Sequence, residues 1–214
     1  MAQQTFIVPI SEELVGPKTK GYSAIVAFLI GLPIKIQGRQ FESGSAERVA
    51  AYLGQMDIID SLTQRYQSTD LCFVVGSSDN LGTAKEGALK IMEIAKIPSL
   101  YFDVEDSMHG PFTILGENAF VVVLGLEPSM KERMDGLMRI LKSLNAKGIF
   151  VSNGRIFSLD DATLDQEDSV TDSIADIVPI QMLAYSFAVV MGKHPTELSY
   201  DRTFVRSITK LAKQ

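Results

Sequence analysis

The chain has 214 residues, of which 46% are hydrophobic and 21% charged, and its 20 basic and 26 acidic residues give a net charge of −6. This apolar content is enough for a buried core and argues against a disordered chain. The acidic balance argues against a nucleic-acid-binding protein, which would need a basic face. The single cysteine excludes a disulfide-rich scaffold or a multi-cysteine metal site, and it fits a reducing compartment.

Neither of the two most apolar stretches predicts a membrane span. Residues 24–32 are far fewer than the ~20 that cross a bilayer, and residues 177–192 are interrupted by Pro179 and by polar side chains. Residues 1–4 lack the basic side chains that open a signal peptide. We therefore expect a soluble, cytoplasmic protein without a membrane partner.

The first 66 residues predict few elements. Residues 5–10 form a short β-rich run, residues 22–36 an apolar helix that ends near Pro33, and residues 45–66 a single amphipathic helix. One strand and two helices cannot close a sheet. The strand would therefore be an unpaired edge unless another element or another chain covers it.

From residue 71 onward, strands and helices alternate. Residues 71–75 are an unbroken apolar run, which is typical of a parallel strand buried on both faces. The other predicted strands are residues 100–104, 119–126 and 148–152, and the predicted helices are residues 81–97, 130–144 and 177–191. This alternation predicts an α/β fold with a three-layer, doubly wound parallel sheet, complete from residue 71 to about residue 192.

A polar loop, residues 76–80, joins the first of these strands to its helix. The free N–H groups of the helix N-terminus and the hydroxyls of Ser77 and Ser78 suit an anion or a polyhydroxylated ligand. The loop is not a dinucleotide fingerprint, because Ser78 stands where the second glycine belongs. An Asx-type turn that only caps the helix is the other open interpretation.

The helix that follows carries Glu86, Lys90 and Glu93 on one face. On an arbitrary helix such a stripe is usually a solvated row of ion pairs. Here the rest of the circumference is almost entirely apolar, which indicates a helix packed on both flanks. We therefore expect the stripe to face a cleft, where a carboxylate can act as a general base.

His109 is a second candidate for proton transfer. The Gly-Pro pair that follows it predicts a rigid turn holding the imidazole at the end of the strand at residues 100–104, and ligands of parallel sheets gather at such strand ends. A purely structural role is the usual alternative for a lone histidine. We assign that structural role to His194, which lies in a polar loop.

These residues belong to motifs that resemble the second sugar-isomerase (SIS) domain of the glucosamine-6-phosphate synthase and fructosamine deglycase families. The motifs are EGALKIME at residues 86–93, MHGP at 108–111, PIQMLAY at 179–185 and RTFVRSIT at 202–209, and VGPKTKGY at 15–22 resembles the end of a first SIS domain. The resemblance covers nearly the whole chain. It implies a SIS domain over residues 67–214, preceded by a remnant of a first SIS domain with linking helices over residues 1–66.

The resemblance implies binding of a phosphorylated sugar or sugar–amino acid adduct and proton transfer between C1 and C2 of the opened sugar. Glu93 matches the family's general base, and Lys90 matches a lysine that orients the substrate and the base. His109 matches the histidine that opens the sugar ring, often in the site of a neighbouring subunit. Further candidate substrate contacts are Ser77, Ser78 and Val15. No metal or other cofactor is implied.

Three departures from the family narrow this expectation. Cys72 lies inside an apolar strand, so glutamine-dependent amidotransfer, which needs an N-terminal cysteine nucleophile, is not expected of this chain. Arg206 replaces the family's isomerase lysine and cannot form a Schiff base, although it can hold a carboxylate or phosphate, which favours deglycation. Most of the first SIS domain, whose loop grips the sugar phosphate, is missing.

Two classes of function remain open. The first is a deglycase or isomerase that is complete only as a homo-oligomer, or in a hetero-complex with a chain supplying the missing SIS half. The second is a non-catalytic phosphosugar-binding or regulatory module, or a truncated half of a tandem-SIS enzyme. In each case the helix at residues 22–36 has too little of its own domain to cover it and should bury against another chain.

Overall fold

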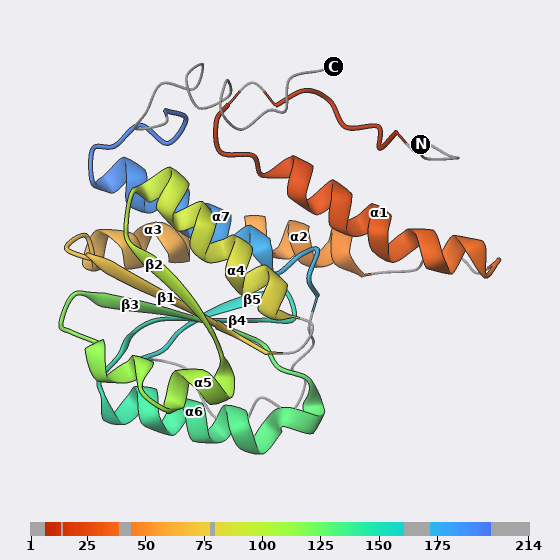
Figure 1. The fold of residues 1–214 in the computed structure, drawn as a ribbon. Helices are drawn as coiled ribbons and strands as arrows, with labels where there is room; N and C mark the ends of the chain where they lie inside the picture. The colour runs from red at the N-terminus through yellow and green to blue at the C-terminus, as the bar shows by residue number, and fades with distance from the viewer. Residues whose placement is uncertain (1–6, 14, 39–43, 78–79, 161–171, 198–214) are drawn as a thin grey trace, which may run out of the picture.

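The computed structural model describes residues 7–13, 15–38, 44–77, 80–160 and 172–197, and in these ranges a sheet lies between two layers of helices (Figure 1). The strands are β1 (Leu71–Gly76), β2 (Ser99–Asp103), β3 (Ala119–Leu124), β4 (Lys147–Ser152) and β5 (Arg155–Ser158). Their order is β2-β1-β3-β4-β5; the first four are parallel, and β5 is antiparallel to β4. The predicted three-layer α/β fold is confirmed, with β5 as an unpredicted antiparallel edge strand.

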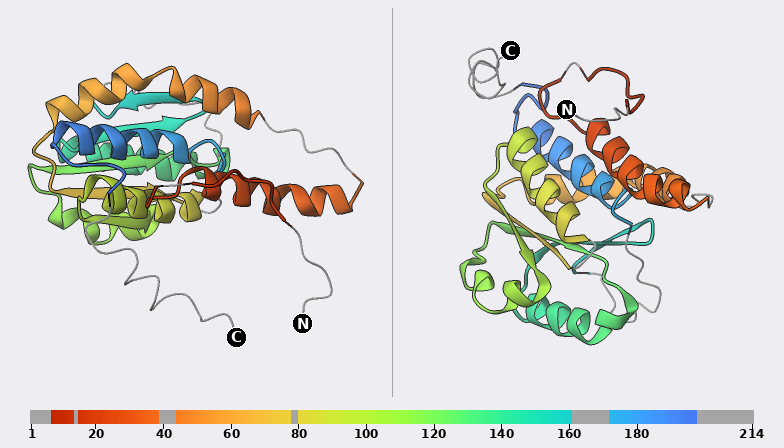
Figure 2. Two further views of the ribbon diagram at one scale, coloured as in Figure 1. Left: turned by 90° about the horizontal axis from the view of Figure 1, so that it is seen from above. Right: turned by 45° about the vertical axis from the view of Figure 1, so that its right-hand side comes forward.

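The helices divide between the two faces of the sheet. They are α1 (Lys20–Ile36), α2 (Ser45–Leu53), α3 (Met56–Arg65), α4 (Leu81–Lys90), α5 (Val104–Met108), α6 (Lys131–Ser143) and α7 (Ile177–Val190), with shorter turns η2 (Ile91–Ala95), η3 (Pro111–Ile114) and η4 (Pro128–Met130). Helices α2, α3, α4 and α7 lie over one face, and α5 and α6 lie over the other (Figures 1 and 2). No helix in the described ranges is long and apolar enough to cross a membrane.

The central strands explain the unbroken apolar runs of the sequence. In β1, Cys72 and Val74 enter the core under α3, α4 and α7, whereas Phe73 and Val75 enter the core above α5 and α6. Because successive side chains of a strand point to opposite faces, a strand covered on both faces must be apolar at every position. The burial of Cys72 raises the pKa of its thiol, as expected of a core residue rather than a nucleophile.

Helices α4 and α7 pack closely because of a glycine. A Cβ atom on Gly87 would lie 2.5 Å from Cδ1 of Ile180, so the absence of a side chain at Gly87 lets the two helices approach. Helix α7 is also joined to α3, where the hydroxyls of Thr63 and Ser186 are 2.7 Å apart. These contacts fix α4, which carries the predicted charged stripe, against the rest of its layer.

The N-terminal region differs from the predictions in three places. Residues 7–10, the described part of the predicted strand, belong to no strand of the sheet, and the N–H of Ile10 donates to the carbonyl of Val8 at 2.8 Å, which is a tight turn rather than an extended strand. Helix α1 continues through Pro33 to Ile36, because on an exposed helix the carbonyl that loses its N–H partner is accessible to water.

The predicted single helix over residues 45–66 is two helices, α2 and α3, separated at Gly54 and Gln55. The Gln55 side chain accounts for the break. Its Nε2 donates to the carbonyl of Gly154 at 2.7 Å, and its Oε1 accepts from the N–H of Ile156 at 2.9 Å. The amide thus binds the backbone of the β4–β5 hairpin, a contact that local sequence does not reveal.

Helix α1 is poorly covered by the rest of the described chain. None of its side chains is buried, and Leu29 is 60% exposed. Its second half extends past the neighbouring elements in Figures 1 and 2. Its start is anchored by Glu13, whose carboxylate accepts from the backbone N–H groups of Thr19, Lys20 and Gly21 at 2.8–2.9 Å. Burial opposes ionisation of Glu13, but these three donors lower its pKa overall.

Candidate functional site

The polar loop after β1 lies at the carboxyl-terminal edge of the sheet. Ser77 is buried there, while Ser78 lies outside the described residues. Asn80 precedes α4 but makes no side-chain capping bond; instead its Nδ2 donates to the carbonyl of Gly125, just after β3, at 2.8 Å. Its Oδ1 is buried without a hydrogen-bond partner in the described part of the chain. The Asn80 side chain therefore does not cap α4, and Asp79, the other Asx residue of this loop, lies outside the described residues.

Glu86, Lys90 and Glu93 form one cluster, as their spacing predicted. The Lys90 ammonium lies 3.3 Å from a carboxylate oxygen of Glu86 and 2.5 Å from one of Glu93. The Lys90 side chain is only 4% exposed, whereas those of Glu86 and Glu93 are 19% and 30% exposed. A buried ammonium thus fixes two half-buried carboxylates that still reach solvent. We refer to these three residues as the Glu–Lys–Glu cluster.

Glu93 lies in a π-helical turn, η2, that continues α4. Ile91, Ile94 and Ala95 of this turn are buried, so it is anchored in the core while Glu93 faces outward. The turn ends at Lys96, whose φ of +55° is left-handed. Single π-helical turns are often found at functional sites, because the extra residue changes the direction of a side chain without ending the helix.

Helix α1 begins beside this cluster. The hydroxyl of Tyr22, in the first turn of α1, lies close to Thr83 and to the carboxylate of Glu86, and burial raises its pKa. Tyr22 also packs against the core that α4 and α7 share. The N-terminal segment therefore reaches the same face of α4 as the predicted base.

His109 lies in the opposite layer of the fold. It follows α5, which packs on α6, and Met108 beside it packs against the core on that side of the sheet. The predicted position at the end of β2 is wrong in detail, because the short helix α5 separates the strand from the histidine. The imidazole is exposed. Within one copy of the chain, the sheet separates His109 from Glu93.

Of the other predicted site residues, the structure describes Ser77 and Val15. Ser77 precedes α4 and Glu93 lies in η2 after it, so about 20 Å of helix separates them. Val15 is exposed in the segment before α1. Arg206 lies outside the described residues. Among the residues that the structure describes, the Glu–Lys–Glu cluster comes together within one copy, whereas Ser77 and His109 lie away from it.

A buried acidic network at the start of α7 was not predicted. Asp176 is fully buried and accepts from the hydroxyl of Tyr52 at 2.8 Å and from the N–H of Asp172 at 2.9 Å. Asp172 in turn pairs with Arg48 at 3.0 Å. Burial raises the pKa of Asp176 to about 6. The network joins α2 to α7 across about 120 residues of sequence, a separation that no local motif could indicate.

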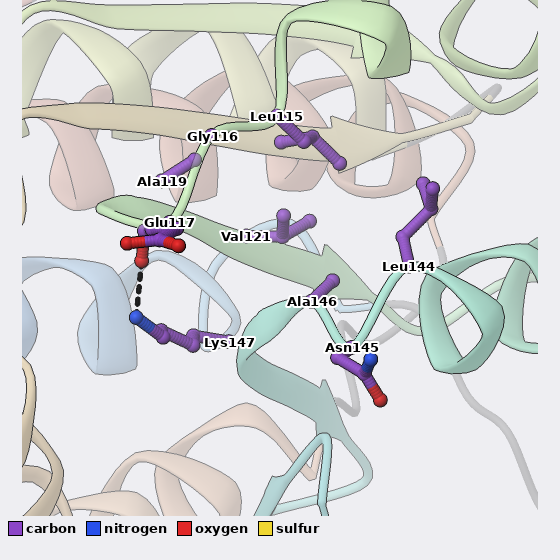
Figure 3. A pocket seen from close by; sticks show the side chains of 9 residues that line it. All are labelled: Leu115, Gly116, Glu117, Ala119, Val121, Leu144, Asn145, Ala146 and Lys147. Atoms are coloured by element: carbon purple, nitrogen blue, oxygen red, sulfur yellow. Dashed lines mark hydrogen bonds between the residues drawn. The ribbon is translucent and has the colours of Figure 1, made fainter.

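A hollow of about 390 Å³ lies at the amino-terminal ends of β3 and β4 (Figure 3). Its lining residues are Leu115, Gly116, Glu117, Ala119, Val121, Leu144, Asn145, Ala146 and Lys147. The Lys147 ammonium donates to the backbone carbonyl of Glu117. None of the predicted site residues lines this hollow, and we assign no role to it.

Comparison with known proteins identifies relatives. No protein-family model matches the chain. The chain is 31% identical over 156 residues to a probable glutamine–fructose-6-phosphate aminotransferase (isomerizing) of Acanthamoeba polyphaga mimivirus, a match that covers 71% of this chain and 25% of that protein. The chain therefore spans about a quarter of the length of that curated relative.

Solved structures share the fold. A glucosamine-6-phosphate deaminase from Thermotoga maritima matches 91% of this chain and 59% of its own, with a TM-score of 0.66 and 23% identity. The C-terminal domain of a glucosamine-fructose-6-phosphate aminotransferase from Francisella tularensis matches 86% of this chain and 57% of its own, with a TM-score of 0.66 and 16% identity. Sequence and fold agree: the chain is a SIS-domain protein that resembles the C-terminal SIS domain of the glutamine–fructose-6-phosphate aminotransferases.

Proposed function

We propose that this chain is the catalytic half of a phosphosugar deglycase or isomerase whose substrate is a phosphorylated ketosamine of the fructosamine 6-phosphate type. The Glu–Lys–Glu cluster carries the proposal, because it offers a solvent-accessible carboxylate held in place by a buried ammonium. The names of the relatives, an aminotransferase for fructose 6-phosphate and a glucosamine-6-phosphate deaminase, support an amino-sugar phosphate as the substrate class.

In this proposal Glu93 moves a proton along the opened sugar. The carboxylate takes a proton from C1 of the ketosamine and returns it to C2, while the N–H proton passes to O2. The product is an imine isomeric with the ketosamine. Water then hydrolyses the imine to an aldose phosphate and a free amine. Lys90 orients Glu93 for the transfer, and Glu86 holds Lys90 from its other side.

His109 opens the sugar ring in the site of another copy of the chain. This arrangement is supported by the position of His109, which lies across the sheet from Glu93. The exposed apolar side chains of α1 support an oligomeric partner, either a second copy or a chain that carries a first SIS domain. Ser77, Ser78, Val15 and Arg206 contribute to binding the phosphate, the sugar hydroxyls or the carboxylate of the amino acid.

In this proposal the chain divides near residue 66. Residues 67–214 form the SIS domain, and residues 1–66 are the remnant of a first domain with its linking helices. Within that remnant, α2 and α3 already pack on the sheet, because Tyr52, Ile59 and Leu62 belong to the core that α4 and α7 share. Of the three helices described in that remnant, α1 alone has no buried side chain, and we propose that it contacts the partner.

The Glu93→Gln variant tests the proposal. With fructosamine 6-phosphate as substrate and release of glucose 6-phosphate as the readout, we expect turnover to fall by about 100-fold or more, because the amide cannot accept the proton. Glu117→Gln, at an exposed glutamate outside the Glu–Lys–Glu cluster, is the matched control. Full turnover by Glu93→Gln would refute the assignment. A wild-type protein that is stabilised by the sugar phosphate without turnover would instead be a binding module.

A further inference from the structure

The backbone around Glu93 is held by two lysine side chains. The Lys96 ammonium donates to the carbonyl of Glu93 itself and to the carbonyl of Glu197, the latter at 2.8 Å. The Lys193 ammonium donates to the carbonyl of Ala95 at 2.7 Å. A helix ends with carbonyl groups that have no partner within the helix, and here two side chains satisfy two of them.

The conformation of Lys96 fits this role. Its φ of +55° is left-handed, a region that residues other than glycine and asparagine rarely adopt. A lysine at such a position is unfavourable for the backbone alone. Its side chain, however, curls back onto the turn that it terminates and bonds a carbonyl three residues earlier. The bonds of the ammonium thus favour a conformation that the backbone by itself would disfavour.

Lys96 and Lys193 also join two distant segments. Lys193 and Glu197 belong to the segment after α7, about 100 residues beyond η2 in sequence. The Lys96 ammonium, from the end of η2, binds the carbonyl of Glu197 in the segment after α7. The Lys193 ammonium, from the segment after α7, binds the carbonyl of Ala95 in η2. The position of the π-helical turn therefore depends on the segment after α7 as well as on α4.

We propose that Lys96 and Lys193 are positioning residues that fix the turn bearing Glu93, an inference that rests on the proposed function of that glutamate. Lys90 holds the Glu93 carboxylate, while Lys96 holds its backbone carbonyl. Glu93 is thereby restrained at both ends. A shift of its carboxylate by about 1 Å would be enough to slow proton transfer by roughly 10- to 100-fold.

Substitutions that spare the fold test this proposal. Lys96→Gly removes the ammonium and suits the left-handed backbone, so the fold itself is not strained. Lys193→Met removes the ammonium of Lys193 and keeps the apolar stem. Lys96→Arg and Lys193→Arg keep the donors, and Lys142→Met, at an exposed position on α6 in the other layer, is the matched control. For each variant, kcat and KM are measured with fructosamine 6-phosphate, and hydrogen exchange is measured on the peptide spanning residues 91–97.

We expect Lys96→Gly and Lys193→Met to lower kcat about 10-fold or more with KM changed less than about twofold, and to accelerate exchange in the peptide. The arginine variants should recover most of kcat. Wild-type kcat and exchange in both Lys96→Gly and Lys193→Met would overturn the proposal, and so would a loss of kcat that arginine does not rescue. If the wild type has no turnover but exchange still accelerates, the lysines hold the turn and the proposed function alone is wrong.

Discussion

Glu93 and His109 lie on opposite faces of one β-sheet. The turn that bears Glu93 packs in the core formed with α4 and α7, and the segment that bears His109 packs with α5 and α6. The topology of the sheet produces this separation. The chain leaves β1 toward β2 over one face and returns from β2 toward β3 over the other, so the two crossover segments cannot share a side. An acid–base pair made from these two residues requires two copies of the chain.

Complementation between two inactive variants follows from this separation. Glu93→Gln and His109→Asn should each be inactive alone. When the two variants are co-expressed, a mixed dimer should regain activity, because one of its two sites combines the native Glu93 of one copy with the native His109 of the other. With random pairing, the recovered turnover on fructosamine 6-phosphate would be about a quarter of wild type. Mixed samples as inactive as either parent would show that the two residues do not act in one shared site.

Lys90 is expected to stabilise the fold through its two carboxylate partners. In Lys90→Met, Glu86 and Glu93 lose the charge between them, and we expect the free energy of unfolding to fall by about 1–2 kcal/mol, a modest loss because both carboxylates are partly exposed. The additional change Glu86→Gln removes one of the two like charges. The double variant should therefore be destabilised by less than the sum of the single changes in urea unfolding at neutral pH. If the two losses of unfolding free energy simply added in the double variant, Glu86 and Lys90 would not be energetically coupled.

Parts of the fold that depend on local pattern were predictable. The strand β1 and the Glu–Lys–Glu cluster follow from apolar runs and helical spacing, which the chain carries within a few residues. A signal for the missed hairpin was also present: Asn153 and Gly154, both with positive φ, are a sequence typical of a two-residue turn.

Features that depend on distant contacts were not predictable. The break between α2 and α3 is coupled to a hairpin about 100 residues away, through Gln55. Asp176 accepts a hydrogen bond from Tyr52, and Lys193 donates one to the turn that bears Glu93. Both bonds join residues that are similarly far apart in sequence. The separation of Glu93 from His109 depends on the strand order, which a single sequence does not specify. Motifs locate the chemical groups, whereas the topology decides which groups of one copy can meet.

Asp176 predicts an unusual dependence of stability on pH. Burial raises its pKa to about 6 from an ordinary value of 3.8, so the folded state binds this proton more tightly than the unfolded state does. Protonation therefore favours folding: stability should increase as pH falls through 6, by about 1 kcal/mol between pH 7.5 and 5.5, and the gain should level off near pH 4. Urea unfolding at a series of pH values measures this contribution.

The Asp176→Asn variant isolates the carboxyl group from other titrating residues. It should be less stable overall, because an amide nitrogen replaces an oxygen that accepts from Tyr52 or from the N–H of Asp172. Its stability should nevertheless lack the rise between pH 7.5 and 5.5 that the wild type has. An identical rise in both proteins would assign the pH dependence to other groups.

The exposed apolar face of α1 predicts self-association or docking of a partner through this helix. Leu29→Glu places a charge at a position that is 60% exposed in one copy, so it should cost the isolated fold little while preventing burial of α1 against another chain. Leu53→Glu is the matched control, because Leu53 is 56% exposed and lies on α2 instead. In sedimentation velocity at micromolar concentration, we expect the wild type and Leu53→Glu to be oligomeric and Leu29→Glu to shift toward monomer.

A wild-type monomer would refute self-association, and the missing cover of α1 would then have to come from a different chain. Equal dissociation of both variants would show that the interface is not specific to α1.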